Sequence, residues 1–340
     1  MLKLLFKLKK LNKSHFNTII LYLCLAPMII SWGTFGHEHI NHAAVFALPP
    51  SMRTFFYNHI DFITQESTVP DLRKYTLNDK SENPRHFIDI ENYGPIDSIP
   101  RSDEAVKKKF DEKFLSKNGT LPWYMQRMMD KLTKAFKEKR KTEILFLAAD
   151  LGHYIGDAYM PLHTTSNYDG QETNQKGIHS FWEAHLPELF GKGYSYNVDD
   201  AIYIEDLREE IWKIIISSHQ LIDTLLITEK KLREIYPSDK VYLQDTGGLV
   251  LKNKFNQPIH SQEYAKQYHM LLNGMVEKQL LKAIKTTANF WYTAWVNAGK
   301  PDLTSLDPAK LSKDNENSLK SDIKLFKQGK LKDLESEKEF

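Results

Sequence analysis

The sequence contains almost no cysteine: of its 340 residues, only Cys24 is one. A single thiol excludes an internal disulfide framework and a zinc site built from cysteines. Glycine and proline are also few, at 15 and 14 residues, which excludes a collagen-like or low-complexity chain. The hydrophobic share of 41% and the charged share of 26% are those of an ordinary globular protein, so extensive disorder is not expected.

The chain also lacks a marked excess of one charge. Lys and Arg number 46 against 44 Asp and Glu, for a formal charge of +2. The first 31 residues hold five of the lysines and no acid, so the rest of the chain carries 41 basic against 44 acidic side chains, or −3. This balance excludes a general nucleic-acid binder that is held by bulk positive charge.

The N-terminal segment has the pattern of a secretory signal peptide. Five lysines lie within residues 1–13, an apolar run covers residues 19–30, and Ser31 follows. This run is shorter than the ~20 residues that span a bilayer, and a basic region before it is typical of a signal peptide. We expect residues 1–31 to be removed between Ser31 and Trp32, which would make the protein secreted or periplasmic. An uncleaved anchor is the alternative, and a lipid anchor on Cys24 is less favoured.

Beyond residue 31 the apolar residues recur mostly at helical spacing, and alternating strand-like runs are scarce. The pattern predicts one all-α, multi-helix domain over 32–300. The charged segment 301–340 is expected to be a flexible tail or a loosely docked helix. Loops rich in Asn, Asp, Gly and Pro are predicted over 66–100 and 164–176. Helices are predicted over 38–48, 52–64, 102–116, 122–139, 142–159, 177–190, 204–236 and 263–297.

One predicted helix carries a potential pair of metal ligands. His153 and Asp157 are four residues apart, so they share a helix face, and His163 follows in the turn beyond that helix. Imidazole nitrogen and carboxylate oxygen are both good zinc ligands. Gly152 and Gly156 in the same helix each cost ~1 kcal/mol of helix stability relative to alanine, which indicates that another segment approaches closely there.

Two further sets of residues repeat this chemistry. His179 and Glu183 are again four residues apart in a predicted helix, and Asp71 precedes His86 by 15 residues across a predicted loop. A single His–carboxylate pair is more often a surface ion pair or a structural core histidine than a metal site. Three such sets in one chain favour metal binding.

The segment His37–His42 contains three more histidines but not a metalloprotease motif. The position four residues after His37 holds Asn41, so the second histidine of a zinc-protease HExxH motif is missing. His39 and His42 are therefore interpreted as ordinary structural or surface histidines.

Together these motifs resemble the zinc-dependent phospholipase C and single-strand-specific nuclease superfamily. The segment Trp-Gly-Thr-Phe-Gly-His at 32–37 directly follows the signal peptide, and the acidic and histidine positions follow in the family's order up to about residue 190. The resemblance implies an all-α fold that holds three zinc ions between helices, with the mature N-terminal residue as a ligand. The implied ligands are Trp32, His37, Asp71, His86, His153, Asp157, His163, His179 and Glu183.

The resemblance also divides these ligands among the three zinc ions. The first zinc would be held by Asp71, His86, His153 and Asp157. The second would be held by the amine and carbonyl of Trp32, His37 and the bridging Asp157. The third would be held by His163, His179 and Glu183.

The catalytic roles that follow from this assignment concern phosphodiester hydrolysis. Paired zinc ions lower the pKa of a shared water, which then attacks phosphorus. Asp71 and Asp157 are the expected catalytic carboxylates. Arg73 and Arg85 are expected to stabilise charge on phosphorus, although each could equally be a surface arginine.

The resemblance leaves the substrate open. Glu183 and the short gap between His163 and His179 slightly favour a phospholipase C-like lipid hydrolase, with possible peripheral membrane contact. The N-terminal Trp-Gly-x-x-Gly-His segment favours the alternative, a single-strand-specific endonuclease or 3′-nucleotidase. Phe87 and Asp89 are expected to bind substrate, by stacking on a base and by hydrogen bonding to its edge.

Other substrate features are negative or remote. Leu72 and Asn83 stand where choline-selective phospholipases carry aromatic residues, so a choline-binding box is not supported. A non-catalytic, exported zinc-binding protein is the remote alternative, and no obligate protein partner is evident.

Overall fold

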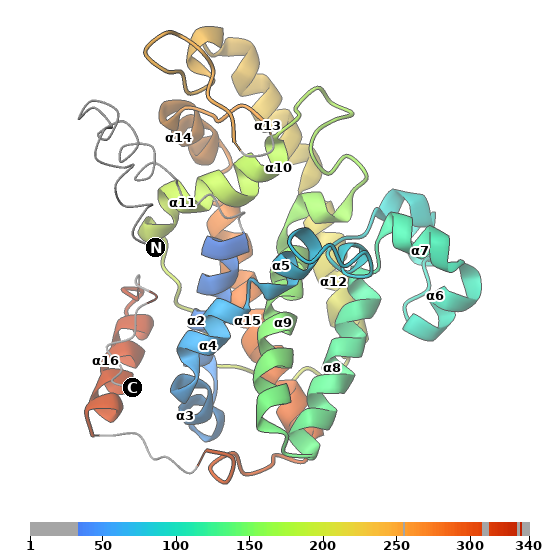
Figure 1. Ribbon diagram of the computed structural model, residues 1–340, viewed down its shortest axis with the longest axis vertical. Helices are drawn as coiled ribbons and strands as arrows, with labels where there is room; N and C mark the ends of the chain where they lie inside the picture. The colour runs from blue at the N-terminus through green and yellow to red at the C-terminus, as the bar shows by residue number, and fades with distance from the viewer. Residues whose placement is uncertain (1–32, 254–255, 308–312, 332–333, 335–340) are drawn as a thin grey trace, which may run out of the picture. The chain divides into compact units, whose positions relative to one another are not determined.

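The structure is a computed structural model that describes residues 33–253, 256–307, 313–331 and 334. The expected signal peptide and Trp32 lie outside these residues. The described helices belong to one compact unit, Ser31–Phe340 (Figure 1). No helix in the described ranges is both long and apolar enough to cross a membrane.

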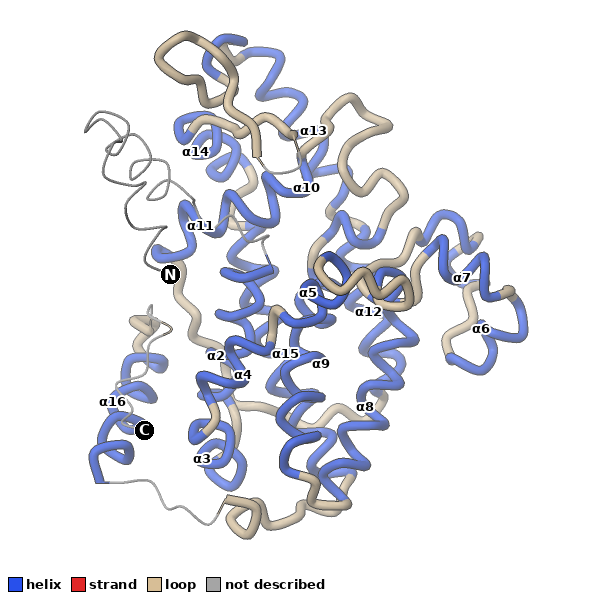
Figure 2. The backbone as a smooth tube through the Cα atoms, viewed as in Figure 1, coloured by secondary structure: helices blue, strands red, loops and turns tan. Residues whose placement is uncertain are grey.

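The described chain is all-α, as the apolar spacing predicts (Figure 2). Within it, strand pairing is limited to isolated bridges between residues 242 and 260. The longer helices are α2 (Glu38–Ala47), α3 (Pro50–Asn58), α8 (Leu121–Lys137), α9 (Lys141–Tyr159), α12 (Leu207–His219), α13 (Ile222–Ile235), α14 (Gln262–Leu271), α15 (Met275–Asn297) and α16 (Lys313–Lys327). The shorter α-helices are α4 (Ile60–Glu66), α5 (Val69–Tyr75), α6 (Asp103–Lys109), α7 (Glu112–Asn118), α10 (Ile178–Ser180) and α11 (Leu186–Phe190).

Short turns of other helical types connect these elements. The π-helical turns are η2 (Gly33–His37) and η7 (Phe181–His185). The 3-10 turns are η3 (Asn83–Arg85), η4 (Ile90–Tyr93), η5 (Ile96–Ser98), η6 (Pro161–Thr164), η8 (Gly191–Gly193) and η9 (Ser238–Lys240).

Several predicted helices are interrupted in the structure. The predicted helix 263–297 breaks into α14 and α15 because Asn273 and Gly274 adopt positive φ angles of 51° and 74°. The predicted helix 102–116 breaks into α6 and α7 at Asp111, whose carboxylate caps α7 by accepting from the Phe114 backbone N–H. Apolar spacing continues across such breaks, so periodicity alone does not locate them. The predicted loop 66–100 contains α5, which has Pro70 in its first turn.

Helix α9 packs against α2, α4, α8 and α15, so its residues are buried on nearly every side. The close approach expected at its glycines is present. A Cβ at Gly152 would overlap the side chain of Asn41, and one at Gly156 would lie 2.7 Å from His37 Nδ1. Asn41 also donates a hydrogen bond from Nδ2 to the carbonyl of Ala149 in α9 (3.0 Å). The α9 glycines therefore bring α2 against the helix that carries His153 and Asp157.

Segments from the end of the chain complete the packing around α2. Helix α15 packs on α2, and its Trp291 stacks on Phe56 of α3 with ring centroids 4.9 Å apart. Helix α16 contacts α2, where Phe326 lies against Phe46 with ring centroids 5.7 Å apart. The part of 301–340 that is described thus contains a packed helix.

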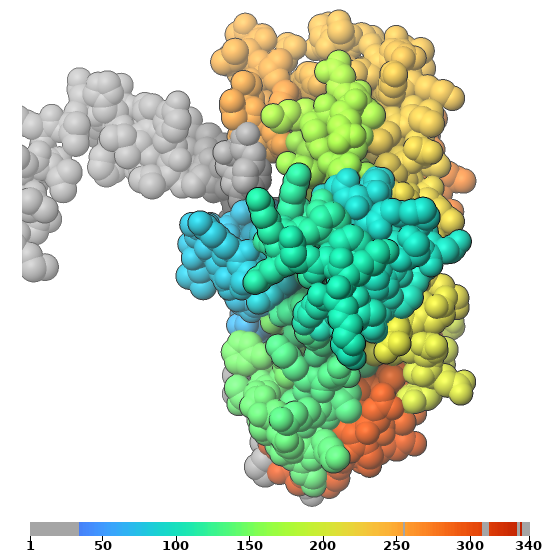
Figure 3. All heavy atoms as spheres, turned by 90° about the vertical axis from the view of Figure 1, so that its right-hand side faces the viewer, coloured from blue at the N-terminus to red at the C-terminus, as the bar shows by residue number. Residues whose placement is uncertain are grey.

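On another side of this unit, the blue-green segment with α6 and α7 faces the viewer in Figure 3, next to the yellow-green chain that follows α9.

Candidate metal centre

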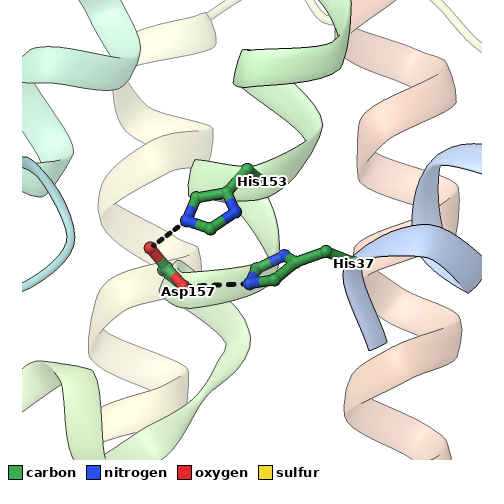
Figure 4. A group of neighbouring side chains, drawn as sticks. All are labelled: His37, His153 and Asp157. Atoms are coloured by element: carbon green, nitrogen blue, oxygen red, sulfur yellow. Dashed lines mark ion pairs between the residues drawn. The ribbon is translucent and has the colours of Figure 1, made fainter. Parts of the chain in front are cut away.

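The centre of the candidate site is Asp157, near the C-terminal end of α9. Its carboxylate lies between two histidines (Figure 4). His153, one helical turn earlier, places Nε2 3.4 Å from Asp157 Oδ2, and His37 at the end of η2 places Nε2 3.5 Å from Oδ1. All three side chains are buried. Asp157 therefore offers one oxygen to each of two histidine nitrogens, as a bridging carboxylate would.

A second group joins Asp157 from the segment that follows α4. His86 comes directly after η3, and its Nδ1 lies 3.0 Å from Asp157 Oδ2 and 3.1 Å from His153 Nε2. Asp71, in the first turn of α5, places Oδ1 3.8 Å from the same Nδ1. Two carboxylates and two imidazoles thus converge, and all but the partly exposed Asp71 are buried.

A third group lies on the segment that leaves α9. His163 in η6 places Nε2 3.1 Å from Glu183 Oε1, and His179 places Nε2 2.6 Å from Glu183 Oε2. The first of these nitrogens is also 3.9 Å from Asp157 Oδ1, so this group adjoins the others. Asp169 holds the helix start in place because its Oδ1 accepts from the backbone N–H of His179 (3.3 Å). Glu183 lies in the π-helical turn η7, a type of turn that is frequent at functional sites.

Eight of the nine predicted ligands are therefore brought together, and the ninth, Trp32, lies outside the described residues. Within each group the potential ligand atoms all lie within 4.8 Å of one another. The groups are His37, His153 and Asp157; Asp71, His86 and His153; and His163, His179 and Glu183.

The chemistry of these groups fits a metal ion. Three of the histidines hydrogen-bond a backbone carbonyl through Nδ1. The acceptors are the carbonyls of Ser67 for His153 (2.8 Å), His86 for His163 (2.6 Å) and Tyr168 for His179 (2.9 Å). A carbonyl only accepts, so Nδ1 carries the hydrogen, and in the neutral ring Nε2 presents a lone pair to a carboxylate. The lone pairs of Nε2 and of the carboxylate oxygen repel unless a proton or a cation lies between them. A hydrogen bond from the other ring nitrogen to a carbonyl is typical of metal-binding histidines.

The electrostatics keep the carboxylates of Asp157 and Glu183 ionised. Burial alone would raise the pKa of Asp157, but the neighbouring His153 and His163 hold it well below its usual range. Burial acts in the same sense on the pKa of Glu183, and it too is outweighed, by His179 and His163. The carboxylates in turn raise the pKa of His163 to about 9, against the effect of its burial. The group therefore holds charged acceptors that a cation could bind without first displacing a carboxylate proton.

Arg73 and Arg85 are both engaged by carboxylates. Arg73 donates from Nη2 to Asp150 Oδ2 (2.7 Å) and from Nε to Glu82 Oε2 (3.1 Å). Arg85 donates from Nη1 to the same Glu82 oxygen (2.7 Å). A direct contact of either guanidinium with substrate therefore stays a prediction, and each would have to share its charge with these partners.

Two residues near the ligands were missed by the sequence reasoning. Glu82 is fully buried, and it contacts His86 through the ring nitrogen that points away from Asp157. Burial tends to raise its pKa, but His86, Tyr154 and the two arginines lower that pKa to about 2. The available sequence signal was the spacing, because Glu82 precedes His86 by four residues, but it stands in a polar stretch between Ser81 and Asn83 that was expected to be a loop.

Lys74 is the other missed residue. Burial tends to lower its pKa, but interactions that include those with Tyr75, Asp71 and Asp157 raise it. Its charge is also felt by His163, whose pKa it lowers. The available signal was the spacing: Lys74 follows Asp71 by three residues, which places both on one face of α5. A cation that interacts electrostatically with Asp71 and Asp157 suits binding of an anionic substrate.

The predicted substrate-binding residues lie next to the ligand segment. Phe87 follows His86 and is half-buried, with its ring against Gly119. Asp89 is also half-buried, and burial together with Glu91 and Glu172 raises its pKa to about 6. Their contact with a substrate stays a prediction.

His39 and His42 lie inside the protein and outside the three groups found among the described residues. His39 Nδ1 bonds the carbonyl of Phe35 (2.6 Å), and His42 Nδ1 bonds Thr64 Oγ1 (3.2 Å). These contacts agree with the structural interpretation of both histidines.

Comparison with known proteins gives two matches. The family model described as S1/P1 Nuclease matches residues 32–285. The protein named Nuclease S1, from Aspergillus oryzae, is 25% identical over 204 residues, which cover 56% of this chain and 66% of that protein. This chain thus spans slightly less than two thirds of the length of that relative.

Proposed function

Since this chain belongs to the S1/P1 nuclease family, we propose that it is a zinc-dependent phosphodiesterase that cleaves single-stranded nucleic acid. The observation that carries the proposal is the convergence of three His–carboxylate groups on Asp157 and Glu183, in a chain that the family model matches over 32–285. Nitrogen and oxygen ligands in such groups suit zinc.

The choice of substrate differs from the slight preference drawn from sequence. The superfamily recognised from the motifs is confirmed, but both matches are to nucleases. They support the endonuclease alternative better than phospholipase C-like cleavage, and they offer no support for a phospholipid substrate or for membrane contact.

We assign three zinc ions to the site, in the sets given by the resemblance. Zinc bound there would activate water for attack on phosphorus and would neutralise charge on the phosphate oxygens. The carboxylates of Asp157 and Glu183 would hold the metal ions at fixed separations, and their supporting hydrogen bonds would keep the imidazole rings oriented.

The residues around the ligands have separate roles in this proposal. Lys74 binds a non-bridging phosphate oxygen and stabilises charge as it develops. Tyr75 is 57% exposed and lies in α5, the helix that carries Asp71. Tyr168 is 56% exposed, and its carbonyl accepts a hydrogen bond from His179. Exposed aromatic rings on segments that carry or contact the ligands suit stacking of unpaired bases, so they support single-stranded nucleic acid as substrate.

Secretion belongs to the same proposal. Removal of residues 1–31 would free the amine of Trp32, which the family resemblance places on the second zinc. A protein that kept its signal segment would lack this ligand. Activity and export are thus linked through one cleavage.

The proposed substrate is tested by supplying the purified, zinc-loaded protein with single-stranded DNA, duplex DNA and a phospholipid emulsion in parallel. We expect chelator-sensitive release of nucleotides, faster from the single strand than from the duplex. Release of diglyceride without nucleotides would contradict the nuclease proposal and would restore the phospholipase alternative. Absence of chelator-sensitive turnover on any phosphodiester would contradict the enzyme itself.

The metal count and the export are tested on the native protein. We expect the secreted or periplasmic protein to begin at Trp32 and to contain three zinc ions per chain, measured by N-terminal sequencing and elemental analysis. A protein that still carries Ser31 before Trp32 and yet contains three zinc ions would contradict ligation by the amine of Trp32.

A further inference from the structure

A buried carboxylate stands directly behind one of the candidate ligands. Glu82 is 0% exposed, and its Oε1 lies 3.6 Å from His86 Nε2. The same oxygen accepts a hydrogen bond from the hydroxyl of Tyr154. Its other oxygen, Oε2, is bound by Arg73 and Arg85. Since an isolated buried carboxylate is costly, this set of partners indicates that its position is tightly fixed.

The ring of His86 lies between Glu82 and the metal groups. Nδ1 points to Asp157, His153 and Asp71, and Nε2 is on the opposite side of the ring. Within the described chain, Nε2 has no hydrogen bond shorter than 3.5 Å, and Glu82 is its ion-pair neighbour. A proton on Nε2 therefore has the Glu82 carboxylate as its acceptor, and it leaves the Nδ1 lone pair for a metal ion.

This arrangement differs from that of three other candidate histidine ligands. His153, His163 and His179 offer Nε2 to the site and donate Nδ1–H to neutral backbone carbonyls. His86 offers Nδ1 and is backed by a charged side chain. A carboxylate acceptor makes the imidazole a more basic ligand than a carbonyl does, and it selects one tautomer.

We propose that Glu82 is the positioning residue for His86, and that Arg73 and Arg85 act through it by holding its carboxylate against the ring. The inference rests on the proposed zinc-dependent function, because it assigns a role toward the metal. Tyr154 and Asp150 complete the support: Tyr154 bonds Glu82, and Asp150 holds the far side of Arg73. The two arginines thus support the candidate ligand His86 indirectly, through their hydrogen bonds to Glu82.

The test is metal affinity rather than turnover. Zinc binding to the mature protein that begins at Trp32 is measured by competition with a chromogenic chelator, and its Co²⁺-substituted form is examined by visible absorption. We expect Glu82→Gln to weaken binding of one metal ion by about 10–100-fold, the usual loss on removing such a partner, and to alter the Co²⁺ spectrum. Glu82→Asp keeps the negative charge but moves it away from His86, and we expect a similar loss of metal affinity. This variant tests the inference if Glu82→Gln does not fold.

Glu229→Gln is the matched control. Glu229 is also 0% exposed, and its partners in the described chain are Gln175, Arg233 and Tyr264, none of them a candidate ligand. We expect wild-type metal affinity and spectrum from this variant. Equal affinity of the Glu82 and Glu229 variants would overturn the inference, whether both were weak or both tight. A wild-type chain that binds no zinc would instead overturn the proposed function.

Discussion

At the scale of single residues, the site is organised by what each side chain does with its second polar atom. His153 and His163 use one ring nitrogen on a carbonyl, which leaves the other for the site. Asp157 divides its two oxygens between different histidines. Fixed orientation of this kind lowers the cost of assembling a metal centre, because little rearrangement is needed when the ion binds.

Lys74 gives a first prediction at this scale. We expect Lys74→Met to lower kcat on single-stranded DNA on the order of 10²-fold, the usual cost of removing one group that stabilises developing charge, with zinc content unchanged. Steady-state kinetics and elemental analysis measure both quantities. Lys80→Met, in the exposed loop after α5, is the control and should keep wild-type kcat. Equal kcat for the two variants would refute the role of Lys74.

His42 gives a second prediction, on stability. Burial, followed by the influence of His39, lowers its pKa from 6.5 to about 3. The unfolded chain takes up a proton below pH 6.5 while the folded chain does not, so His42 makes the protein less stable as pH falls from 6.5 toward 3. The slope is up to about 1.4 kcal/mol per pH unit.

The measurement is urea unfolding of the chelator-treated protein across this range. His42→Gln should flatten the fall relative to wild type, and above pH 6.5 the two curves should run parallel. Curves that stay parallel down to pH 3 would show that His42 does not titrate as expected.

At the scale of elements, α9 does most of the positioning. Its helical spacing sets His153 and Asp157 on one face, and its glycines admit Asn41 and His37 from α2 and η2. The π-helical turn η2 ends at the candidate ligand His37, and the π-helical turn η7 contains the candidate ligand Glu183. Glycine in a helix interior lowers helix stability. At Gly152 and Gly156 this cost accompanies a close contact between α9 and the segments that carry Asn41 and His37.

Gly156→Ala tests this close contact. Helix propensity alone favours alanine by ~1 kcal/mol, but the added Cβ would lie 2.7 Å from His37 Nδ1, and overpacking costs ~1–3 kcal/mol. We expect a lower Tm and weaker zinc binding, measured by calorimetry and chelator competition. Gly193→Ala, where no atom lies within 4 Å of the new Cβ, should leave both unchanged. A rise in Tm for Gly156→Ala would mean that His37 moves aside without cost.

At the scale of the whole molecule, the candidate site joins segments that are far apart in the chain, and all of its ligands among the described residues lie between His37 and Glu183. The later helices act through packing: α15 supports α2, α8 and α9, and α16 lies on α2. The expected division between a domain at 32–300 and a tail at 301–340 stays a prediction, which the contacts of α16 allow to be tested.

Phe326→Ala in the full chain, and a chain that ends at Lys300, provide that test. Both remove the contact of α16 with Phe46, and the shorter chain also removes the bond from Tyr57 to Asp322. We expect a lower Tm, with about 3–5 kcal/mol lost for the buried phenylalanine, and unchanged zinc content and turnover. Loss of zinc from the shortened chain would place residues 301–340 within the metal-binding domain.

The sequence by itself determined the helical class and the local ligand pairs. His153 with Asp157, and His179 with Glu183, are fixed by helix geometry, because residues four apart share a face wherever the helix lies. The order of the motifs was enough to recognise the superfamily, which the family match confirms. Gly152 and Gly156 likewise signalled a close approach before its partner was known.

Only the tertiary structure decided which distant groups meet. It brought His86 against Asp157 and buried Glu82 behind it, although Glu82 lies among exposed neighbours. It also engaged Arg73 and Arg85 with carboxylates and brought the charge of Lys74 under the influence of Asp157. These contacts join residues up to 77 positions apart in the chain. They depend on how α5 and η3 pack on α9, which no local spacing encodes.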